Sequence, residues 1–304
     1  MGKTIAIINP TAGGYRTKRL WPQLEKPLRK LFPDLEIFWT VARGDACQLA
    51  KSHSGEADLV LACGGDGTIH EVANGMLQQA ESGKLPSLGI ISLGTGSDLI
   101  KSLGIPSDPF QQIEILGRKR ETQIDVGEID YATPNGRGKS FFLNIADAGM
   151  GADVLRRLGH SRTLLGRRLA YLFSTLHSYR NRKPAEMKIL IDGDESWSEK
   201  ALLIAVANGK SFGGGMQIAP HADLRDGLLD LVVVRDLPPW WLPFALPCLY
   251  LKKINLLPQV EIKKAKQIEI SSKEEVFLDI DGELVGSLPV SFKIRPQALS
   301  VRVP

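Results

Sequence analysis

The run Gly64-Gly65-Asp66-Gly67-Thr68 holds the residue types that could bind a phosphate. It follows the apolar run 59–63 and precedes the helix-like stretch 69–77. A buried strand that ends in a glycine turn and opens a helix directs free backbone N–H groups and the positive helix end at one point, which suits an anion. Asp66 adds a carboxylate, which a phosphate site accommodates when a divalent cation lies between the two. The run therefore predicts a site for a magnesium nucleotide.

Two further glycine loops support the same prediction. Residues 9–14 follow the strand-like run 4–8, and residues 93–98 follow the strand-like run 88–91. All three loops would lie at the carboxyl edge of one parallel sheet, where open α/β sheets bind ligands. A single loop of this kind is equally typical of a strand-to-helix turn without a ligand. The glycine spacing matches neither the Walker A motif nor G-x-G-x-x-G.

The elements that position these loops alternate between strand and helix. Strands are expected at 4–8, 35–40, 58–63 and 88–92, and helices near 17–31, 45–53 and 68–80, with another after residue 97. This alternation predicts right-handed βαβ units and a parallel sheet. Beyond about residue 122 strand-like runs dominate, at 122–129, 140–145, 187–191, 201–207, 228–234, 267–271 and 276–280. Turn dipeptides separate several of these runs: Asp192-Gly193, Asp226-Gly227 and Asp281-Gly282.

The sequence thus predicts two domains. The first is an open α/β nucleotide-binding domain over residues 1–122, to which a tail at about 290–304 can return. The second is a mostly antiparallel β-sandwich over residues 123–289.

Composition limits the class of protein. The chain has 304 residues, of which 43% are hydrophobic and 24% charged, as in globular proteins. A net charge of +4 is compatible with an anionic membrane surface, but is too small to indicate a nucleic-acid binder. The three cysteines, Cys47, Cys63 and Cys248, predict reduced thiols rather than disulfides or a zinc site. A strand that begins by residue 4 leaves no room for a signal peptide, so we expect a cytoplasmic protein.

Two segments could meet a membrane. Residues 237–257 contain Trp240 and Trp241 but also four prolines, which argue against a spanning helix. This segment is either a buried, irregular helix on a sheet or an interfacial patch beside Lys252-Lys253. Residues 153–182 interleave arginines with leucines and predict amphipathic helices, whose basic face either is solvated or contacts anionic headgroups.

Short motifs follow one another along nearly the whole chain. They are Asn9-Pro10 with Gly13-Gly14, Thr40 with Gly44-Asp45-Ala46, Gly64–Thr68 with Glu71-Val72 and Asn74-Gly75, Leu93-Gly94-Thr95-Gly96 with Asp98, Ile124-Asp125-Val126-Gly127, Phe142-Leu143-Asn144 with Gly149 and Gly151, Gly213-Gly214-Gly215-Met216 with Ile218-Ala219-Pro220, Asp226-Gly227 with Leu229-Asp230, and Asp281-Gly282-Glu283. In this order they resemble the diacylglycerol kinase catalytic-domain family, which includes sphingosine and ceramide kinases. The length resembles that of the compact bacterial members. Gly-Gly-Asp-Gly by itself also occurs in NAD kinases and phosphofructokinases.

The resemblance implies a nucleotide site on the first domain. The residues expected to touch ATP are Asn9, Pro10, Thr11, Gly13, Thr40, Gly64, Gly65, Asp66, Gly67, Thr68, Ile69, His70 and Thr95. The sequence departs from the family pattern at Ser97, where Asn is usual, and at His70, where small bacterial relatives often carry Asn. Both departures leave the preferred donor nucleotide open. A histidine in the first turn of a helix is otherwise typical of a solvated neighbour of the cap.

The resemblance also implies the catalytic and metal-binding groups. Glu283 matches the general base, and Asp66 would hold the catalytic Mg²⁺ through water. A structural Mg²⁺ would be bound by Asp226 together with main-chain oxygens of Asp223 and Leu228. From the residues alone, Asp281-Gly282 indicates a hairpin turn and Asp226-Gly227 an ordinary turn.

The expected function is that of an ATP-dependent lipid kinase. The cleft between the domains would hold the hydroxyl of a membrane lipid, most simply diacylglycerol giving phosphatidic acid, with 123–289 as the lipid domain. The expected partners are the lipid and, transiently, an anionic membrane surface; a homodimer is compatible with the sequence, and no nucleic acid is expected. The alternatives are a sphingoid or ceramide kinase, a soluble-substrate kinase similar to NAD kinase, and a catalytically weak regulator that binds nucleotide and lipid.

Overall fold

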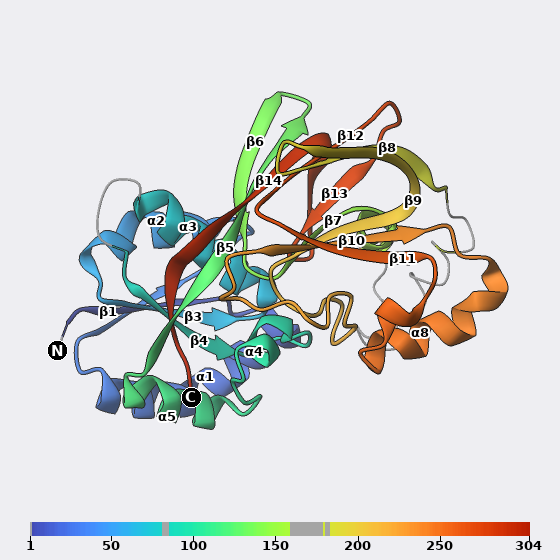
Figure 1. Ribbon diagram of the computed structural model, residues 1–304. Coiled ribbons are helices and arrows are strands. Elements are labelled where there is room, and N and C mark those ends of the chain that lie inside the picture. Colours follow the sequence, from blue (N-terminus) through green and yellow to red (C-terminus); the bar gives the residue numbers. More distant parts are fainter. Residues whose placement is uncertain (1, 81–84, 159–178, 180–182) are drawn as a thin grey trace. The chain divides into compact units, whose positions relative to one another are not determined.

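A computed structural model describes residues 2–80, 85–158, 179 and 183–304 (Figure 1). The chain divides into two compact units. Unit 1 comprises Met1–Ile124 and Gln297–Pro304, and unit 2 comprises Asp125–Pro296. The divisions thus fall at Ile124 and Pro296, where the sequence suggested 122 and about 290.

Unit 1 is built on a parallel sheet with the strand order β2 (Leu35–Trp39), β1 (Thr4–Ile8), β3 (Leu59–Gly64) and β4 (Ser87–Ser92). Every residue of β1, β3 and β4 is buried, because helices cover both faces of the sheet (Figure 1). The C-terminal end of β14 (Glu283–Arg302) joins this sheet, with Val301 opposite Leu88 of β4. The predicted α/β class is confirmed, and the four predicted strands lie within a residue of the observed ones.

The helices of unit 1 are α1 (Ala12–Leu31), α2 (Asp45–His53), α3 (Asp66–Ala80), α4 (Asp98–Ser102) and α5 (Pro109–Arg118), with the 3-10 turn η1 (Ser54–Glu56). Figure 1 shows α1 and α5 on one face of the sheet and α2 and α3 on the other. The beginning of α1 is irregular, because Gly13, Gly14 and Tyr15 have positive φ angles of 61°, 66° and 66°. The regular part therefore begins close to residue 17, where the sequence placed it.

Unit 2 is an antiparallel β structure. Its strands are β5 (Glu121–Thr133, shared with unit 1), β6 (Gly136–Phe142), β7 (Ile145–Gly149), β8 (Ala185–Ile191), β9 (Glu195–Ala207), β10 (Leu229–Arg235), β11 (Val260–Ala265), β12 (Gln267–Ser272), β13 (Phe277–Ile280) and most of β14. Strands of unit 2 pair in a closed circuit, in the order β8, β9, β7, β13, β14, β12 and back to β8. They surround a core that includes Phe142, Met187 and Phe292. Strands β10 and β11 extend the sheet from β9. The antiparallel, β-rich second domain is confirmed.

The structure corrects three details of the sequence prediction in unit 2. The predicted strand 140–145 is two strands, β6 and β7, separated at Leu143 and Asn144. The strands β11 and β14 were not predicted, and β14 runs for twenty residues. Residues 237–257 form the turns η2 (Pro239–Trp241) and η3 (Ile254–Leu256) and the helix α8 (Leu242–Tyr250), with one side buried and the other exposed.

Of the predicted amphipathic segment 153–182, residues 153–158 belong to α6 (Met150–Leu158) and Tyr179 is described; the rest lies outside the described residues. In the part of the chain that the structure covers, every helix is too short or too polar to cross a membrane.

Candidate active site

Three loops of unit 1 converge at the carboxyl ends of β1, β3 and β4. The Asn9 side chain after β1 donates to Thr68 Oγ1 in the first turn of α3, at 3.1 Å. Its amide oxygen accepts the Thr11 N–H at 3.0 Å, which shapes the loop that enters α1. The Leu93 N–H after β4 donates to Gly64 O at 2.7 Å. The predicted meeting of the three glycine loops is therefore present in unit 1.

These loops approach each other main chain to main chain. A Cβ atom on Gly94 would lie 2.6 Å from the Gly65 Cα atom, a distance that real Cβ atoms essentially never show. A Cβ on Gly13, whose φ is +61°, would collide with the Leu93 carbonyl. Only glycine permits this close packing, which leaves the rim formed by main-chain groups. A rim of this kind suits a phosphate.

Asp66 links the β3 loop to the β4 loop. Its two carboxylate oxygens accept the N–H groups of Ser97 at 2.7 Å and Asp98 at 3.1 Å. Ser97 has a left-handed backbone (φ 57°), a conformation that asparagine adopts readily and serine rarely, and its hydroxyl lies 3.0 Å from Ser92 Oγ. Asp66 thus positions the loop that also carries the exposed Thr95. Its expected role toward a metal ion remains a prediction.

Thr40 reaches the same edge of the sheet through the loop after β2. The Thr40 N–H donates to Ile8 O at 2.9 Å, which continues the β1–β2 ladder by one residue. Glu71 of α3 accepts the N–H groups of Gly44 at 3.0 Å and Ala46 at 3.2 Å. The loop 40–46 is therefore tied to the helix that follows the Gly64–Thr68 turn.

His70 and Ile69 lie inside unit 1 rather than at its surface. His70 is buried, and its Nε2 lies 3.3 Å from Asn74 Nδ2. The solvated position expected for this histidine is therefore wrong; one turn of helix brings Asn74 under the ring. Ile69 is also buried, so it can present only main-chain atoms to a ligand at this edge.

In unit 2, Asp281 and Gly282 form the two-residue turn between β13 and β14. Their φ angles of 49° and 90° are those of a hairpin turn, so the hairpin interpretation is confirmed. The Asp281 carboxylate accepts three backbone N–H groups at 2.9–3.0 Å, those of Leu143, Asn144 and Ile145. These bonds explain why the predicted strand 140–145 breaks there. Glu283 is the first residue of β14, directly after this turn.

Two acidic residues that the sequence did not indicate as site residues lie next to the Asp281-Gly282 turn. Asp147 on β7 lies opposite Asp279 on β13, and both are buried. Burial raises the pKa of Asp147 to about 7. Burial, and then the neighbouring Asp147, raises the pKa of Asp279 well above its ordinary value. The pair therefore retains a proton near neutral pH, while Asp279 Oδ1 accepts the Gly282 N–H at 2.8 Å.

Asn208 connects the break between β6 and β7 to Asp125, which in turn bonds the loop before β10. Its Nδ2 donates at 2.9 Å to the carbonyl oxygens of both Asp125 and Leu143. The Asp125 carboxylate, fully buried, accepts the Gly227 N–H at 2.7 Å. Asn208 was not predicted from the sequence, although it stands before Gly209 at the end of a strand-like run, a pattern that could have indicated it.

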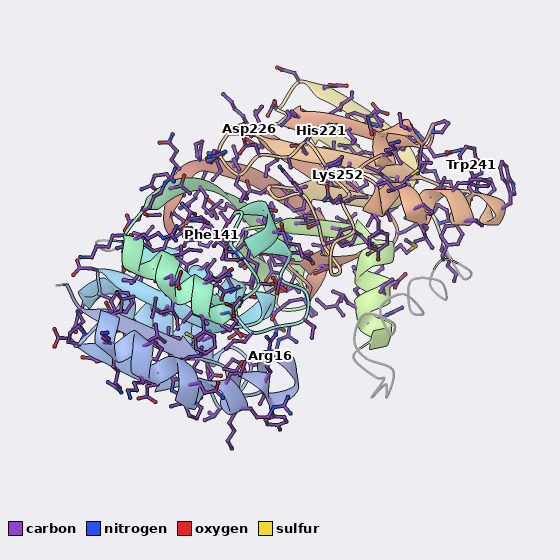
Figure 2. The ribbon with its side chains drawn as sticks, turned by 90° about the horizontal axis from the view of Figure 1, so that it is seen from below. Arg16, Phe141, His221, Asp226, Trp241 and Lys252 are labelled. Atoms are coloured by element: carbon purple, nitrogen blue, oxygen red, sulfur yellow. The ribbon has the colours of Figure 1, made fainter. Side chains whose placement is uncertain are left out.

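The residues expected to hold a structural Mg²⁺ make other contacts. Asp226, labelled in Figure 2, accepts the Leu228 N–H at 3.0 Å and pairs with the Lys264 ammonium at 2.6 Å. Lys264 also lies 3.2 Å from Asp230, and burial raises the pKa of Asp230. Asp223 pairs with Arg225.

The ligand set expected for Mg²⁺ has one carboxylate and two main-chain oxygens, whereas magnesium takes about six oxygen ligands in octahedral geometry. Within the described ranges, no three acidic, histidine or cysteine side chains come together in a way that could hold a metal, but a site with a single carboxylate needs no such cluster. The expected Mg²⁺ therefore stays a prediction. The cation beside Asp226 is an ammonium group, so no chemical step is derived through a metal at this loop.

Comparisons with known proteins agree along the whole chain. Residues 3–129 match the diacylglycerol kinase catalytic domain, and residues 144–303 match the YegS C-terminal NAD kinase beta sandwich-like domain. A diacylglycerol kinase of Staphylococcus saprophyticus is 31% identical over 98% of this chain and 94% of its own length. A diacylglycerol kinase of Bacillus subtilis is also 31% identical, over 96% of this chain and 93% of its own length.

Solved structures give the same result. The crystal structure of a putative diacylglycerol kinase from Bacillus anthracis has a TM-score of 0.79 at 27% identity, and covers 99% of this chain and 97% of its own. An NAD kinase from Archaeoglobus fulgidus in complex with ATP has a TM-score of 0.55 at 13% identity, over 98% of this chain and 93% of its own. The second likeness is one of fold alone.

Proposed function

Since this chain belongs to the diacylglycerol kinase family, we propose that it transfers the γ-phosphate of ATP to the hydroxyl of a membrane diacylglycerol. The observation that carries the proposal is the convergence of the Asn9, Gly64 and Leu93 loops at one edge of the parallel sheet. Phosphoryl transfer depends on positioning and charge stabilisation more than on covalent help from the protein. A rim of main-chain groups on packed glycine loops supplies that positioning.

In the proposed reaction, unit 1 binds the nucleotide. The phosphates lie against the Gly64–Thr68 turn at the N-terminus of α3, where backbone N–H groups and the helix dipole favour negative charge. Asn9, Thr40 and Thr95 border this turn from the neighbouring loops. Asp66 would hold the Mg²⁺ of the nucleotide through water, and the ion would supply positive charge that stabilises the transferred group.

Glu283 of unit 2 is the proposed general base. An alcohol attacking the γ-phosphate is helped by a carboxylate that accepts its proton. The Asp281-Gly282 turn, with its three backbone hydrogen bonds, holds Glu283 at a defined place at the start of β14. Because the acceptor is a lipid, the proposal includes transient contact with an anionic membrane surface, to which the net charge of +4 is suited.

The test is a phosphorylation assay with γ-labelled ATP or GTP and a panel of acceptors: diacylglycerol, sphingosine and ceramide in mixed micelles, and NAD in solution. We expect label in the organic phase with diacylglycerol and ATP. Glu283→Gln should lower turnover by at least about a hundredfold, within the range of general-base catalysis. The exposed Glu269→Gln is the matched control and should retain full turnover.

The outcomes separate the alternatives. Label on sphingosine or ceramide would change the acceptor and leave the kinase chemistry in place. Label on NAD would identify a soluble-substrate enzyme. Nucleotide binding without label on any acceptor would favour a regulator and overturn the proposed function.

A further inference from the structure

Helix α8 and its flanking turns expose an apolar surface on unit 2. The exposed fractions are 65% for Trp240, 63% for Phe244 and 63% for Leu251. These residues recur at intervals of four and seven positions, so they share one side of the helix. Tyr250 (54% exposed) and Leu256 (66% exposed) lie beside them in the chain. We call Trp240, Phe244, Tyr250, Leu251 and Leu256 the α8 patch.

The opposite side of the helix packs on the sheet of unit 2. Ala245 is buried in a cluster with residues of β9 and β10, and Ile254 and Leu257 fix the following turn in the same cluster. Trp241 is partly buried; its ring centroid lies 5.2 Å from that of Trp240 and 6.4 Å from that of Phe244. The buried side of the helix therefore fixes the α8 patch on the surface of unit 2. Figure 2 labels Trp241, which lies in the turn η2 at the start of this helix.

A helix that is apolar on all sides is normally buried on all sides. The nine residues of α8 contain no charged side chain, yet one side of the helix faces outward. An apolar face of this kind marks a surface that is covered by something else when the protein works.

The charges around the patch indicate the occupant. Residues 237–260 contain no Asp or Glu, whereas Lys252 and Lys253 follow the helix and are exposed. Trp and Tyr are the residues that concentrate at membrane–water interfaces, because their rings are apolar and their N–H and O–H groups remain wet. Apolar anchors bordered by lysines complement the interface of an anionic bilayer.

We propose that the α8 patch is the surface by which this protein inserts into an anionic lipid bilayer, with Trp240 and Phe244 as anchors and Lys252-Lys253 at the headgroups. The choice of a membrane as occupant rests on the proposed lipid-kinase function. The patch belongs to unit 2, as does Glu283, the proposed base.

Vesicle cosedimentation tests the proposal directly and needs no turnover. The full-length protein is mixed with phosphatidylcholine vesicles that do or do not contain phosphatidylglycerol. The double variant Trp240→Ser/Phe244→Ser should bind anionic vesicles at least about tenfold more weakly, since each buried aromatic side chain contributes substantially to transfer from water. Neutralising Lys252 or Lys253 to Gln should weaken binding about fivefold each, and on anionic vesicles alone.

Phe110→Ser is the matched control. Phe110 is an exposed aromatic residue of α5 in unit 1, 44% exposed, and its replacement should leave vesicle binding unchanged. As a readout that needs no disruptive substitution, brominated lipids should quench the tryptophan fluorescence of the protein. Trp240→Phe, which keeps a ring on the patch, should still bind vesicles but show weaker quenching.

Turnover of a short-chain diacylglycerol dissolved as monomers separates this proposal from the proposed function. The double variant should phosphorylate this soluble acceptor at the wild-type rate and lose activity only on vesicles. Wild-type vesicle binding by the double variant would overturn the membrane role of the patch. So would a dimer, seen by sedimentation, that the same substitutions dissociate while vesicle binding stays intact. Normal vesicle binding together with no phosphorylation of any acceptor would instead refute the proposed function and leave the patch assignment standing.

Discussion

Asp147 and Asp279 face each other across the β7–β13 pairing, both buried, directly behind the turn that carries Glu283. Asp279 accepts the Gly282 N–H at 2.8 Å, and so connects the acidic pair to the Asp281-Gly282 hairpin. Two buried carboxyl groups at directly paired strand positions cannot both ionise without a large cost, so they share a proton. A proton held in the interior makes the stability of this region depend on pH.

The sign of that dependence follows from the raised pKa values. In the folded protein burial raises the pKa of Asp147 to about 7, whereas an unfolded aspartate has a pKa of about 3.9. The stabilising effect is therefore fully present below about pH 4 and is lost as the pH rises through the folded-state value near 7. Each pKa unit between the folded and unfolded states corresponds to about 1.4 kcal/mol.

We expect Asp279→Asn to reduce this pH dependence, because only Asp147 of the pair can then titrate. Asparagine keeps an acceptor for the Gly282 N–H and a donor toward Asp147, but has no proton to lose. Relative to wild type, the variant should lose less free energy of unfolding as the pH rises from about 4 to about 7, as measured by urea denaturation. Asp194→Asn, at an exposed turn position, is the control and should follow the wild-type curve. If the free energy of unfolding of Asp279→Asn changes with pH as it does in wild type, the pair holds no proton.

Gly94→Ala should weaken both nucleotide binding and stability. The new Cβ would lie 2.6 Å from the Gly65 Cα atom, so the β3 and β4 loops must move apart. We expect a loss of about 1–3 kcal/mol in the free energy of unfolding and at least about tenfold weaker binding of a non-hydrolysable ATP analogue by calorimetry.

Gly104→Ala provides the control for stability. Gly104 has a φ of +68° and open space around it, so the substitution costs backbone strain but disturbs no loop contact. It should destabilise the protein by about 1–2 kcal/mol without changing analogue affinity. Equal loss of affinity in both variants would show that the glycine loops do not form the nucleotide site.

Asp281→Asn and Glu283→Gln should both lower turnover, but only Asp281→Asn should also lower stability. An asparagine at 281 can accept on one oxygen alone, so at least one of the three N–H groups of the β6–β7 break loses its partner. We expect a loss of about 1–3 kcal/mol in the free energy of unfolding, accompanied by reduced turnover. Glu283→Gln should reduce turnover while thermal unfolding stays as in wild type. If Asp281→Asn unfolds like wild type, the turn does not depend on these bonds.

Lys264→Gln tests which cation stabilises the loop before β10. Lys264 lies 2.6 Å from Asp226 and 3.2 Å from Asp230, and its own pKa is raised because these hydrogen bonds outweigh its partial burial. Removing the ammonium leaves Asp230, which is nearly inaccessible, without its cation, and should cost about 1–3 kcal/mol.

Magnesium completes that test. We expect EDTA to leave the unfolding temperature of the wild-type protein unchanged, and added Mg²⁺ to restore part of the stability of Lys264→Gln. Lys188→Gln, an exposed lysine on β8, should respond to neither treatment. A clear drop in the wild-type unfolding temperature with EDTA would favour the structural Mg²⁺ that the family resemblance implied.

Local sequence patterns were sufficient for the four parallel strands and the first three helices of unit 1, whereas α5 was not predicted. The strands at 4–8 and 59–64 and the helix at 45–53 follow from apolar runs and helical periodicity, which act over a few residues. The glycine loops were found for the same reason, since a strand, a turn and a helix start are adjacent in the chain. The hairpin at Asp281-Gly282 also depends on two neighbouring residues.

The roles of single side chains depended on partners that are distant in the chain. Asp281 is bonded to residues more than 130 positions away, and Asp66 to residues 31 and 32 positions away. The Asp147–Asp279 pair and the Lys264–Asp230 contact exist because antiparallel register places those residues opposite each other.

The sequence by itself therefore determined the α/β and antiparallel β classes, the glycine loops and the family. The tertiary structure decided which carboxylates pair with N–H groups, with a lysine or with each other, and which side of α8 faces outward. The reason is physical: backbone preference and hydrophobic period are properties of adjacent residues, whereas burial and hydrogen-bond partnership are properties of the packed chain.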